Sequence, residues 1–222
     1  MSKLTYAPLP EWVHIIRAIF NRQLKMSDLA KYWSVDKDKN YWFSRSAWSL
    51  YAIVKFRNAV DSKDKVNVWL PDYFCNESIE PLRTLSVNIF FYPVMHDGKP
   101  NLTKCSEEIV TLVPDIIVFV HYFGVPTYSQ GLYKLARKNK AWLVEDAVHC
   151  VFPEQGIGGY GDFVLYSPHK TLAIPDGGVL LIRENGPNKI SNNFLIEHGF
   201  DELYFAMMSG SPLLNIESYK WL

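Results

Sequence analysis

The sequence predicts an α/β protein in which a mostly parallel central sheet is flanked by helices. Two observations carry this prediction. Short apolar runs bounded by turn-forming residues alternate with stretches of helical spacing, as in βαβ units. The longest of these runs is apolar throughout rather than alternating, which is typical of a parallel strand that is buried on both faces. Strands joined through helices in this way require right-handed crossovers.

Six segments are predicted strands: 66–70, 87–92, 115–121, 142–145, 162–166 and 178–182. Helices are predicted before, between and after them, over 12–21, 27–32, 47–59, 78–85, 106–112, 131–139 and 193–208. Residues 41–47 are expected to lead into the helix that follows them, with Ser44 or Ser46 as its N-cap. The chain accordingly divides into a helical arm (1–40), one large domain (41–185) and a helical segment (186–222).

Composition excludes several classes of protein. The chain is 48% hydrophobic and 21% charged, so it can build a core. Its 23 basic residues balance 23 acidic ones, which argues against nucleic acid or an anionic membrane as partner. Cys75, Cys105 and Cys150 lack the spacing of a metal site, so we expect reduced thiols and no metal. The absence of a secretory h-region or membrane-spanning run indicates a cytoplasmic location.

Polar residues stand where two predicted strands end. Asp146 follows strand 142–145, with His149 three residues later, and Ser167 follows strand 162–166, with Lys170 three residues later. Ligands of open α/β sheets bind at the carboxyl ends of strands, so Asp146 and Lys170 are expected to face one pocket. An aspartate that pairs with a pyridinium nitrogen and a lysine that forms a Schiff base are what pyridoxal 5′-phosphate requires. The alternative is a helix N-cap and a solvated loop lysine.

Four motifs occur in order along the second half of the chain. They are Glu145-Asp146-Ala147-Val148-His149, Gly159-Tyr160-Gly161-Asp162, Ser167-Pro168-His169-Lys170 and Gly177-Gly178. Together they resemble the DegT/DnrJ/EryC1/StrS family of fold-type I pyridoxal phosphate aminotransferases. The resemblance covers about residues 42–185 and implies that 41–185 is the cofactor-binding large domain. It also implies a small C-terminal domain that is absent here, so 186–222 is interpreted as the start of a truncated region.

The resemblance implies roles for individual residues. Lys170 and Asp146 would be catalytic, and His149 would bond the cofactor's 3′-oxygen or support Asp146. Ser46 and Ala47, at a helix N-terminus, would bind the phosphate together with Ser167. The family places a stacking aromatic ring at the position of Cys75, so here Phe74, Tyr73 or the Cys75 thiol is expected against the cofactor. Core packing is the alternative for Phe74 and Tyr73. His121 is interpreted as a hydrogen-bonded residue at a strand end rather than a catalyst.

The expected function is that of an aminotransferase that moves an amino group from glutamate to a nucleotide-linked keto sugar. The sugar substrate rests on the resemblance alone. Two alternatives stay open: a pyridoxal phosphate lyase of the cysteine desulfurase type, and a non-catalytic cofactor-binding member of the same fold. Enzymes of this type have active sites at homodimer interfaces, so a homodimer is expected, with the aromatic-rich arm as a contact.

Overall fold

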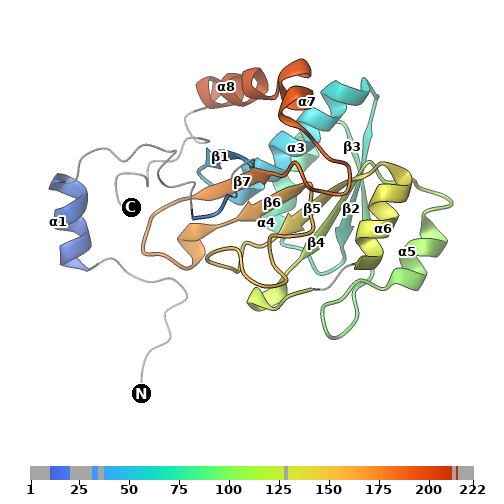
Figure 1. Cartoon of the computed structure of the whole chain (residues 1–222), viewed down its shortest axis with the longest axis horizontal. Coiled ribbons are helices and arrows are strands. Elements are labelled where there is room, and N and C mark those ends of the chain that lie inside the picture. Colours follow the sequence, from blue (N-terminus) through green and yellow to red (C-terminus); the bar gives the residue numbers. More distant parts are fainter. Residues whose placement is uncertain (1–10, 21–31, 35–37, 128–129, 212–213, 215–222) are drawn as a thin grey trace.

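A seven-stranded sheet forms the centre of the computed structural model, which describes residues 11–20, 32–34, 38–127, 130–211 and 214 (Figure 1). The strands are β1 (Lys39–Phe43), β2 (Val66–Pro71), β3 (Val87–Tyr92), β4 (Ile116–Val120), β5 (Trp142–Asp146), β6 (Phe163–Tyr166) and β7 (Gly178–Ile182). Their order across the sheet is β1-β7-β6-β5-β4-β2-β3. The predicted α/β class is confirmed, and all six predicted strands are present.

Most neighbouring strands run parallel, from β3 through β2, β4 and β5 to β6. Strand β7 is the exception, because it is antiparallel to both β6 and β1. Strand β1 therefore runs in the same direction as β6. As a result the carboxyl ends of β1, β2, β4, β5 and β6 share one edge of the sheet with the beginning of β7.

Strand β1 corrects the prediction that residues 41–47 only lead into a helix. Lys39–Phe43 pairs with β7 over five residues, and Tyr41, Trp42 and Phe43 are buried. A segment of five residues that begins with two polar ones carries too weak a local signal to predict a strand. The pairing with a segment about 140 residues further along the chain is what stabilises it.

The described helices are α1 (Trp12–Phe20), α3 (Ser46–Asp61), α4 (Asn76–Ile79), α5 (Leu102–Glu108), α6 (Gln130–Asn139), α7 (Asn192–Glu197) and α8 (Phe200–Gly210). Of these, α3 to α8 lie around the sheet (Figure 1). The described residues also form three 3₁₀ turns: η1 (Glu80–Thr84), η2 (Tyr122–Gly124) and η3 (Pro168–Lys170). Four of the predicted helices, at 12–21, 47–59, 78–85 and 131–139, correspond to described helical segments. The helix predicted over 27–32 lies almost wholly outside the described residues.

Two helix predictions were wrong in their bounds. The helix expected over 106–112 spans Leu102–Glu108, because the Asn101 side chain accepts the Lys104 N–H and caps it there. The single helix expected over 193–208 is two helices, α7 and α8. Gly199 separates them with a left-handed backbone (φ +70°) that glycine adopts without strain.

Both faces of the sheet are covered, which accounts for its continuous apolar strands. On one face, α3 and α8 pack on the strands through residues such as Ile53, Phe56 and Phe200. On the other, α6 contributes Leu132 and Ala136 over the centre of the sheet, and Trp33 packs near β7. Burying a side chain of this size contributes roughly 1.5–3 kcal/mol. Among the described residues, no helix is both long and apolar enough to span a membrane.

The division into an arm (1–40), a large domain (41–185) and a C-terminal segment (186–222) remains a proposal. Strand β1 begins at Lys39, just inside the proposed arm. Leu195, Phe200 and Met207, from the proposed C-terminal segment, belong to the same hydrophobic cluster as α3 and the sheet. These helices therefore help to cover the large domain.

Candidate active site

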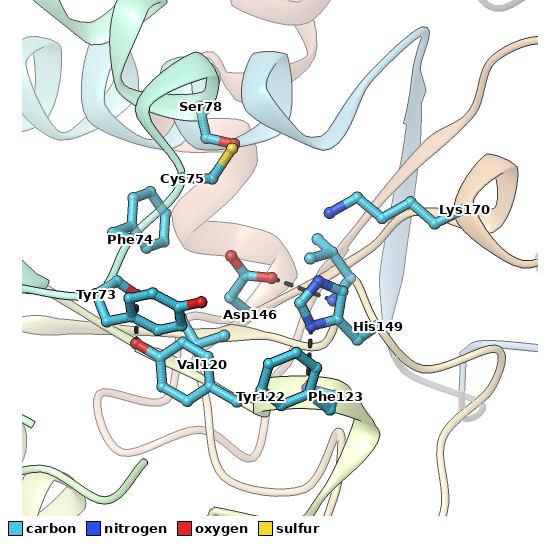
Figure 2. A pocket seen from close by; sticks show the side chains of 11 residues that line it. Tyr73, Phe74, Cys75, Ser78, Val120, Tyr122, Phe123, Asp146, His149 and Lys170 are labelled. Atoms are coloured by element: carbon cyan, nitrogen blue, oxygen red, sulfur yellow. Dashed lines mark hydrogen bonds between the residues drawn. The ribbon is translucent and has the colours of Figure 1, made fainter. Parts of the chain in front are cut away.

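A cavity of about 230 Å³ opens at the edge where the strands end (Figure 2). The loops after β2, β4, β5 and β6 surround it. Its lining consists of Tyr73, Phe74, Cys75, Ser78, Val120, Tyr122, Phe123, Asp146, Val148, His149 and Lys170. The structure therefore brings together five of the eight predicted site residues: Asp146, Lys170, His149, Phe74 and Cys75.

Asp146, the last residue of β5, is a buried carboxyl group at the base of this cavity. Only 6% of it is exposed, and Oδ1 accepts the Val148 N–H at 3.1 Å. Burial raises its pKa to about 6, although the Val148 N–H and the positive charge of Lys170 act in the opposite direction. A buried carboxylate is unfavourable without a cationic partner, so this group is well placed to pair with a cation bound in the cavity.

Lys170 reaches the cavity from a different element. After β6, Ser167 and Pro168 turn the chain into η3, and the Lys170 N–H closes the turn on the Ser167 carbonyl at 2.9 Å. The Lys170 side chain is exposed, and its amine extends toward the space above Asp146 (Figure 2). The cavity thus has a carboxylate at its base and a primary amine at its side.

His149 forms the rim beside them. Its Nδ1 accepts the backbone N–H of Phe123 at 3.1 Å, and the two rings lie nearly parallel, at 13°. Burial, and then the charge of Lys170, lower the pKa of His149, which favours the neutral ring. Because Nδ1 accepts a hydrogen bond, the proton of the neutral ring is on Nε2, which is free to act as a donor. Within the described residues, the His149 ring bonds Phe123 rather than Asp146.

The other three predicted residues lie at the same edge of the sheet but outside the cavity lining. Ser46 and Ala47 begin α3, and Ser167 is fully buried with its Oγ 3.2 Å from His169 Nδ1. The prediction that Ser44 or Ser46 caps α3 was wrong. Arg45 occupies the N-cap with an extended backbone, and its side chain makes no capping hydrogen bond.

A buried pair behind the cavity, Glu145 and His121, was only partly anticipated. His121 was expected to be a hydrogen-bonded strand-end residue, and the structure confirms this. Its Nε2 lies 2.7 Å from Glu145 Oε1, and its Nδ1 accepts the Thr127 N–H at 2.9 Å. Its backbone N–H also donates to the Asp146 carbonyl at 3.0 Å. His121 thus joins the ends of β4 and β5.

Sequence reasoning assigned no role to Glu145, which is fully buried. Besides His121, its carboxylate accepts the backbone N–H groups of Gly158, Tyr160 and Gly161 at 2.5–2.9 Å. Burial alone would raise the pKa of Glu145, but these hydrogen bonds lower it below the usual range, so Glu145 is ionised. The sequence did contain a signal for this role, because Glu145 ends an otherwise apolar predicted strand. A glutamate that is buried in such a strand needs hydrogen-bond partners.

Comparison with known proteins identifies the chain. The model of the DegT/DnrJ/EryC1/StrS aminotransferase family matches residues 93–212, more than half of the 222 residues and the part that contains β4–β7, Asp146 and Lys170. The chain belongs to this family. The resemblance inferred from the four motifs is thereby confirmed. Family membership classes the chain with aminotransferases.

Three similar proteins are informative. A UDP-N-acetyl-3-dehydro-alpha-D-glucosamine 3-aminotransferase of Acidithiobacillus ferrooxidans is 32% identical over 81 residues, 34% of this chain and 22% of the relative. The structure of Helicobacter pylori PseC, an aminotransferase of pseudoaminic acid biosynthesis, superimposes with a TM-score of 0.69 at 15% identity, covering 94% of this chain and 56% of PseC. The structure of a cysteine desulfurase from Thermococcus onnurineus NA1 superimposes with a TM-score of 0.54 at 19% identity, covering 71% of this chain and 41% of the desulfurase.

The two structures have the same fold as this chain, and at these identities the likeness extends no further than the fold. The chain spans 22% of the curated relative and 56% of PseC, well under two thirds of either. The family and the fold are thus established.

Proposed function

We propose that this protein is a pyridoxal phosphate-dependent aminotransferase that transfers an amino group from glutamate to a nucleotide-linked keto sugar. One observation carries the proposal. The buried Asp146 carboxyl and the Lys170 amine, from two different strand ends, line one cavity in a chain of an aminotransferase family. Their positions support the roles of catalytic residues.

The cavity suits this cofactor on chemical grounds. A pyridinium N–H would supply the cation that the buried Asp146 carboxylate lacks, and would bring its raised pKa down. Phe74 and Cys75 on one loop and Val148 on another line the cavity and would bound a flat ring. The phosphate would extend toward Ser46, Ala47 and Ser167, because the N-terminus of α3 offers backbone N–H groups and a favourable dipole.

Bound here, pyridoxal phosphate would supply a carbonyl that condenses with amines and a ring that withdraws electrons. Lys170 would hold the cofactor through its amine and, once released by the donor, would move a proton to and from the reacting substrate carbon. Asp146 would stay ionised beside the ring nitrogen and keep it protonated. His149 would donate from Nε2 to the ring oxygen, since its Nδ1 is engaged by Phe123.

The acceptor is proposed from the relatives. Both PseC and the Acidithiobacillus enzyme are aminotransferases of sugar metabolism, and the name of the latter specifies a UDP-linked keto sugar. The same proposal includes a homodimer, with the helical arm as a contact, and a cytoplasmic location. Three free thiols, Cys75, Cys105 and Cys150, favour a reducing compartment.

The test uses the full-length protein in two half-reactions. With pyridoxal phosphate added, glutamate should convert the bound cofactor to its amine form, and a UDP-linked keto sugar should convert it back. Simple 2-keto acids other than 2-oxoglutarate, which is the product of the glutamate half-reaction, should not. Borohydride should fix the cofactor on Lys170. A label on another lysine would refute the assignment of Lys170. Release of alanine and sulfur from cysteine would favour a desulfurase, and cofactor binding without either reaction would favour a non-catalytic protein.

A further inference from the structure

A second cavity, of about 700 Å³, lies next to the first at the same edge of the sheet. The loops after β2, β3 and β4 form it, and its lining comprises Tyr73, Val94, Met95, His96, Asp97, Gly98, Asn101, Tyr122, Phe123 and Val125. Three of these residues, Tyr73, Tyr122 and Phe123, also line the first cavity. The two cavities therefore share an aromatic wall. Figure 2 shows its three rings where they line the first cavity.

The shared wall is held in place by specific contacts. The Tyr122 hydroxyl donates to the Tyr73 carbonyl at 2.6 Å, which joins the loops after β4 and β2. Gly98, in the turn after β3, packs against the Tyr122 ring so closely that a Cβ there would lie 2.9 Å from a ring carbon. That turn is closed by the Met95 N–H, which donates to the Lys99 carbonyl at 2.8 Å. The second cavity is thus preformed, as small-molecule sites usually are.

Phe123 stands between the two cavities in an unusual state. The residue is 79% exposed, and its backbone has φ +56°, a region that bulky residues rarely adopt. The hydrogen bond from its N–H to His149 helps to hold this conformation. Strained backbone of this kind persists where the surrounding structure enforces it, most often at ligand sites. Here it keeps an aromatic face open to ligands beside the candidate active site.

The lining indicates the chemistry of the ligand. Three of the ten lining residues are tyrosine or phenylalanine, and Tyr73 is 64% exposed in addition to Phe123. The lining residues include no lysine or arginine, and the carboxylate of Asp97 is paired with Lys99 at 2.5 Å. His96 is the single basic residue of this lining, so the surface offers a diphosphate few of the cationic partners that it requires. The surface suits an uncharged ring with a flat face, since stacking on aromatic side chains needs no charge.

We propose that the second cavity binds an uncharged ring of the amino acceptor, while the reacting carbon lies beside the Lys170 amine in the first cavity. The inference rests on the proposed function, because it takes the acceptor to be a nucleotide-linked sugar. Either its nucleobase or its sugar ring has this chemistry. The loops after β2, β3 and β4 would thus select the acceptor, and the first cavity would perform the transfer.

The test fills the second cavity without touching the first. Val125→Trp and Met95→Trp each place a large ring at a residue that lines only the second cavity and is partly exposed, so folding should tolerate both. Val110→Trp is the matched control, because Val110 is 84% exposed and lines neither cavity. Both variants should raise the KM for the UDP-linked keto sugar about 10-fold or more and leave the glutamate half-reaction within about 2-fold. The control should change neither.

Binding measurements distinguish a nucleobase from a sugar ring as the group that occupies the second cavity. Saturation-transfer NMR on the full-length, cofactor-loaded protein would use uridine and N-acetylglucosamine as probes. Loss of the uridine signal in both variants assigns the cavity to the nucleobase, and loss of the N-acetylglucosamine signal assigns it to the sugar. An unchanged KM together with unchanged probe signals in both variants would overturn the inference. If the wild-type protein does not react with glutamate, the proposed function fails, and the probe signals alone then decide whether the cavity binds a ring.

Discussion

Two adjacent residues of β5, Glu145 and Asp146, show that hydrogen-bond partners rather than burial decide the charge of a buried carboxyl. Both side chains are removed from water. Glu145 has a histidine and three backbone N–H groups as partners, and its pKa is lowered. Asp146 accepts a single backbone N–H within the described residues, and burial raises its pKa to about 6. The strand thus ends in one carboxylate that serves structure and another that is available to a ligand.

The first prediction concerns Asp146 in the cofactor-free protein. Since the folded pKa is raised from 3.8 to about 6, the protonated carboxyl stabilises the fold below about pH 4, and this stability is lost as the pH rises through 6. The difference corresponds to at most roughly 3 kcal/mol. At pH 8 the free energy of unfolding of Asp146→Asn should therefore exceed that of wild type by about 1–3 kcal/mol, so the variant should unfold at a higher urea concentration. It should also bind the cofactor poorly.

Urea titrations at several pH values, with and without cofactor, measure both effects. The stability of wild type should fall more steeply between pH 4 and 7 than that of Asp146→Asn. Identical slopes for the two proteins would show that Asp146 does not titrate in this way.

The second prediction concerns Glu145. A glutamine at this position keeps the size but replaces a charged acceptor with an amide, so loop N–H groups of Gly158–Gly161 lose part of their bonding. Breaking a buried ionic network in this way costs about 3–5 kcal/mol. Glu145→Gln should lose stability of that order in urea unfolding followed by tryptophan fluorescence. Glu154 is an exposed glutamate in the same loop region, so Glu154→Gln is the control and should change the stability little. Equal stability of the two variants would contradict the role of Glu145.

At the scale of elements, the position of α3 depends on how β7 begins. Gly178 starts β7 beside the N-terminus of α3, and a Cβ there would lie 2.4 Å from the Ser46 nitrogen and from the Arg45 carbonyl carbon. The Gly177 N–H also donates to the Ser44 carbonyl at 2.7 Å. The start of the antiparallel strand thus fixes the helix end that is proposed to bind the cofactor phosphate.

The third prediction tests this contact. Gly178→Ala should displace the N-terminus of α3, lower stability by about 1–3 kcal/mol through overpacking, and weaken pyridoxal phosphate binding, as followed by absorbance titration. Gly210→Ala is the control, because a Cβ at Gly210 meets nothing within 4 Å. If Gly178→Ala bound the cofactor as tightly as Gly210→Ala, the helix end would not form part of the site.

At the scale of the whole molecule, α1 carries a cluster of exposed apolar side chains. Trp12, Ile19 and Phe20 are 70–82% exposed, and Ile16 is 54% exposed. Contiguous apolar surface of this kind marks interaction sites in soluble proteins. The proposed homodimer gives this helix a role as a contact between subunits.

The fourth prediction is that the full-length protein is a dimer in light scattering. Ile16→Ser combined with Phe20→Ser should weaken the dimer, because an apolar helix face that is buried in a contact would then carry hydroxyl groups. Val110→Ser, also at an exposed apolar residue, should leave the mass unchanged. A full-length wild-type protein that is monomeric at every concentration would reject the proposal.

The sequence alone was sufficient for the class of the fold, six of its seven strands and the family. Apolar runs rich in β-branched and aromatic residues have a high strand propensity. Residues at strand ends meet because parallel strands share an edge. This is why Asp146 and Lys170 could be expected to face one pocket before their geometry was known, whereas the role of His149 came from the family resemblance. Short motifs in a fixed order then pointed to the family.

Only the tertiary structure decided the rest. Strand β1 and the antiparallel direction of β7 depend on pairing between distant segments, which local pattern does not encode. The network of Glu145 and the second cavity depend on side chains and backbone groups from loops that are separate in sequence. The N-cap of α3 likewise falls on Arg45 because β1 and β7 fix where that helix begins. Local propensity determines which elements form, and long-range packing determines where their ends and polar groups meet.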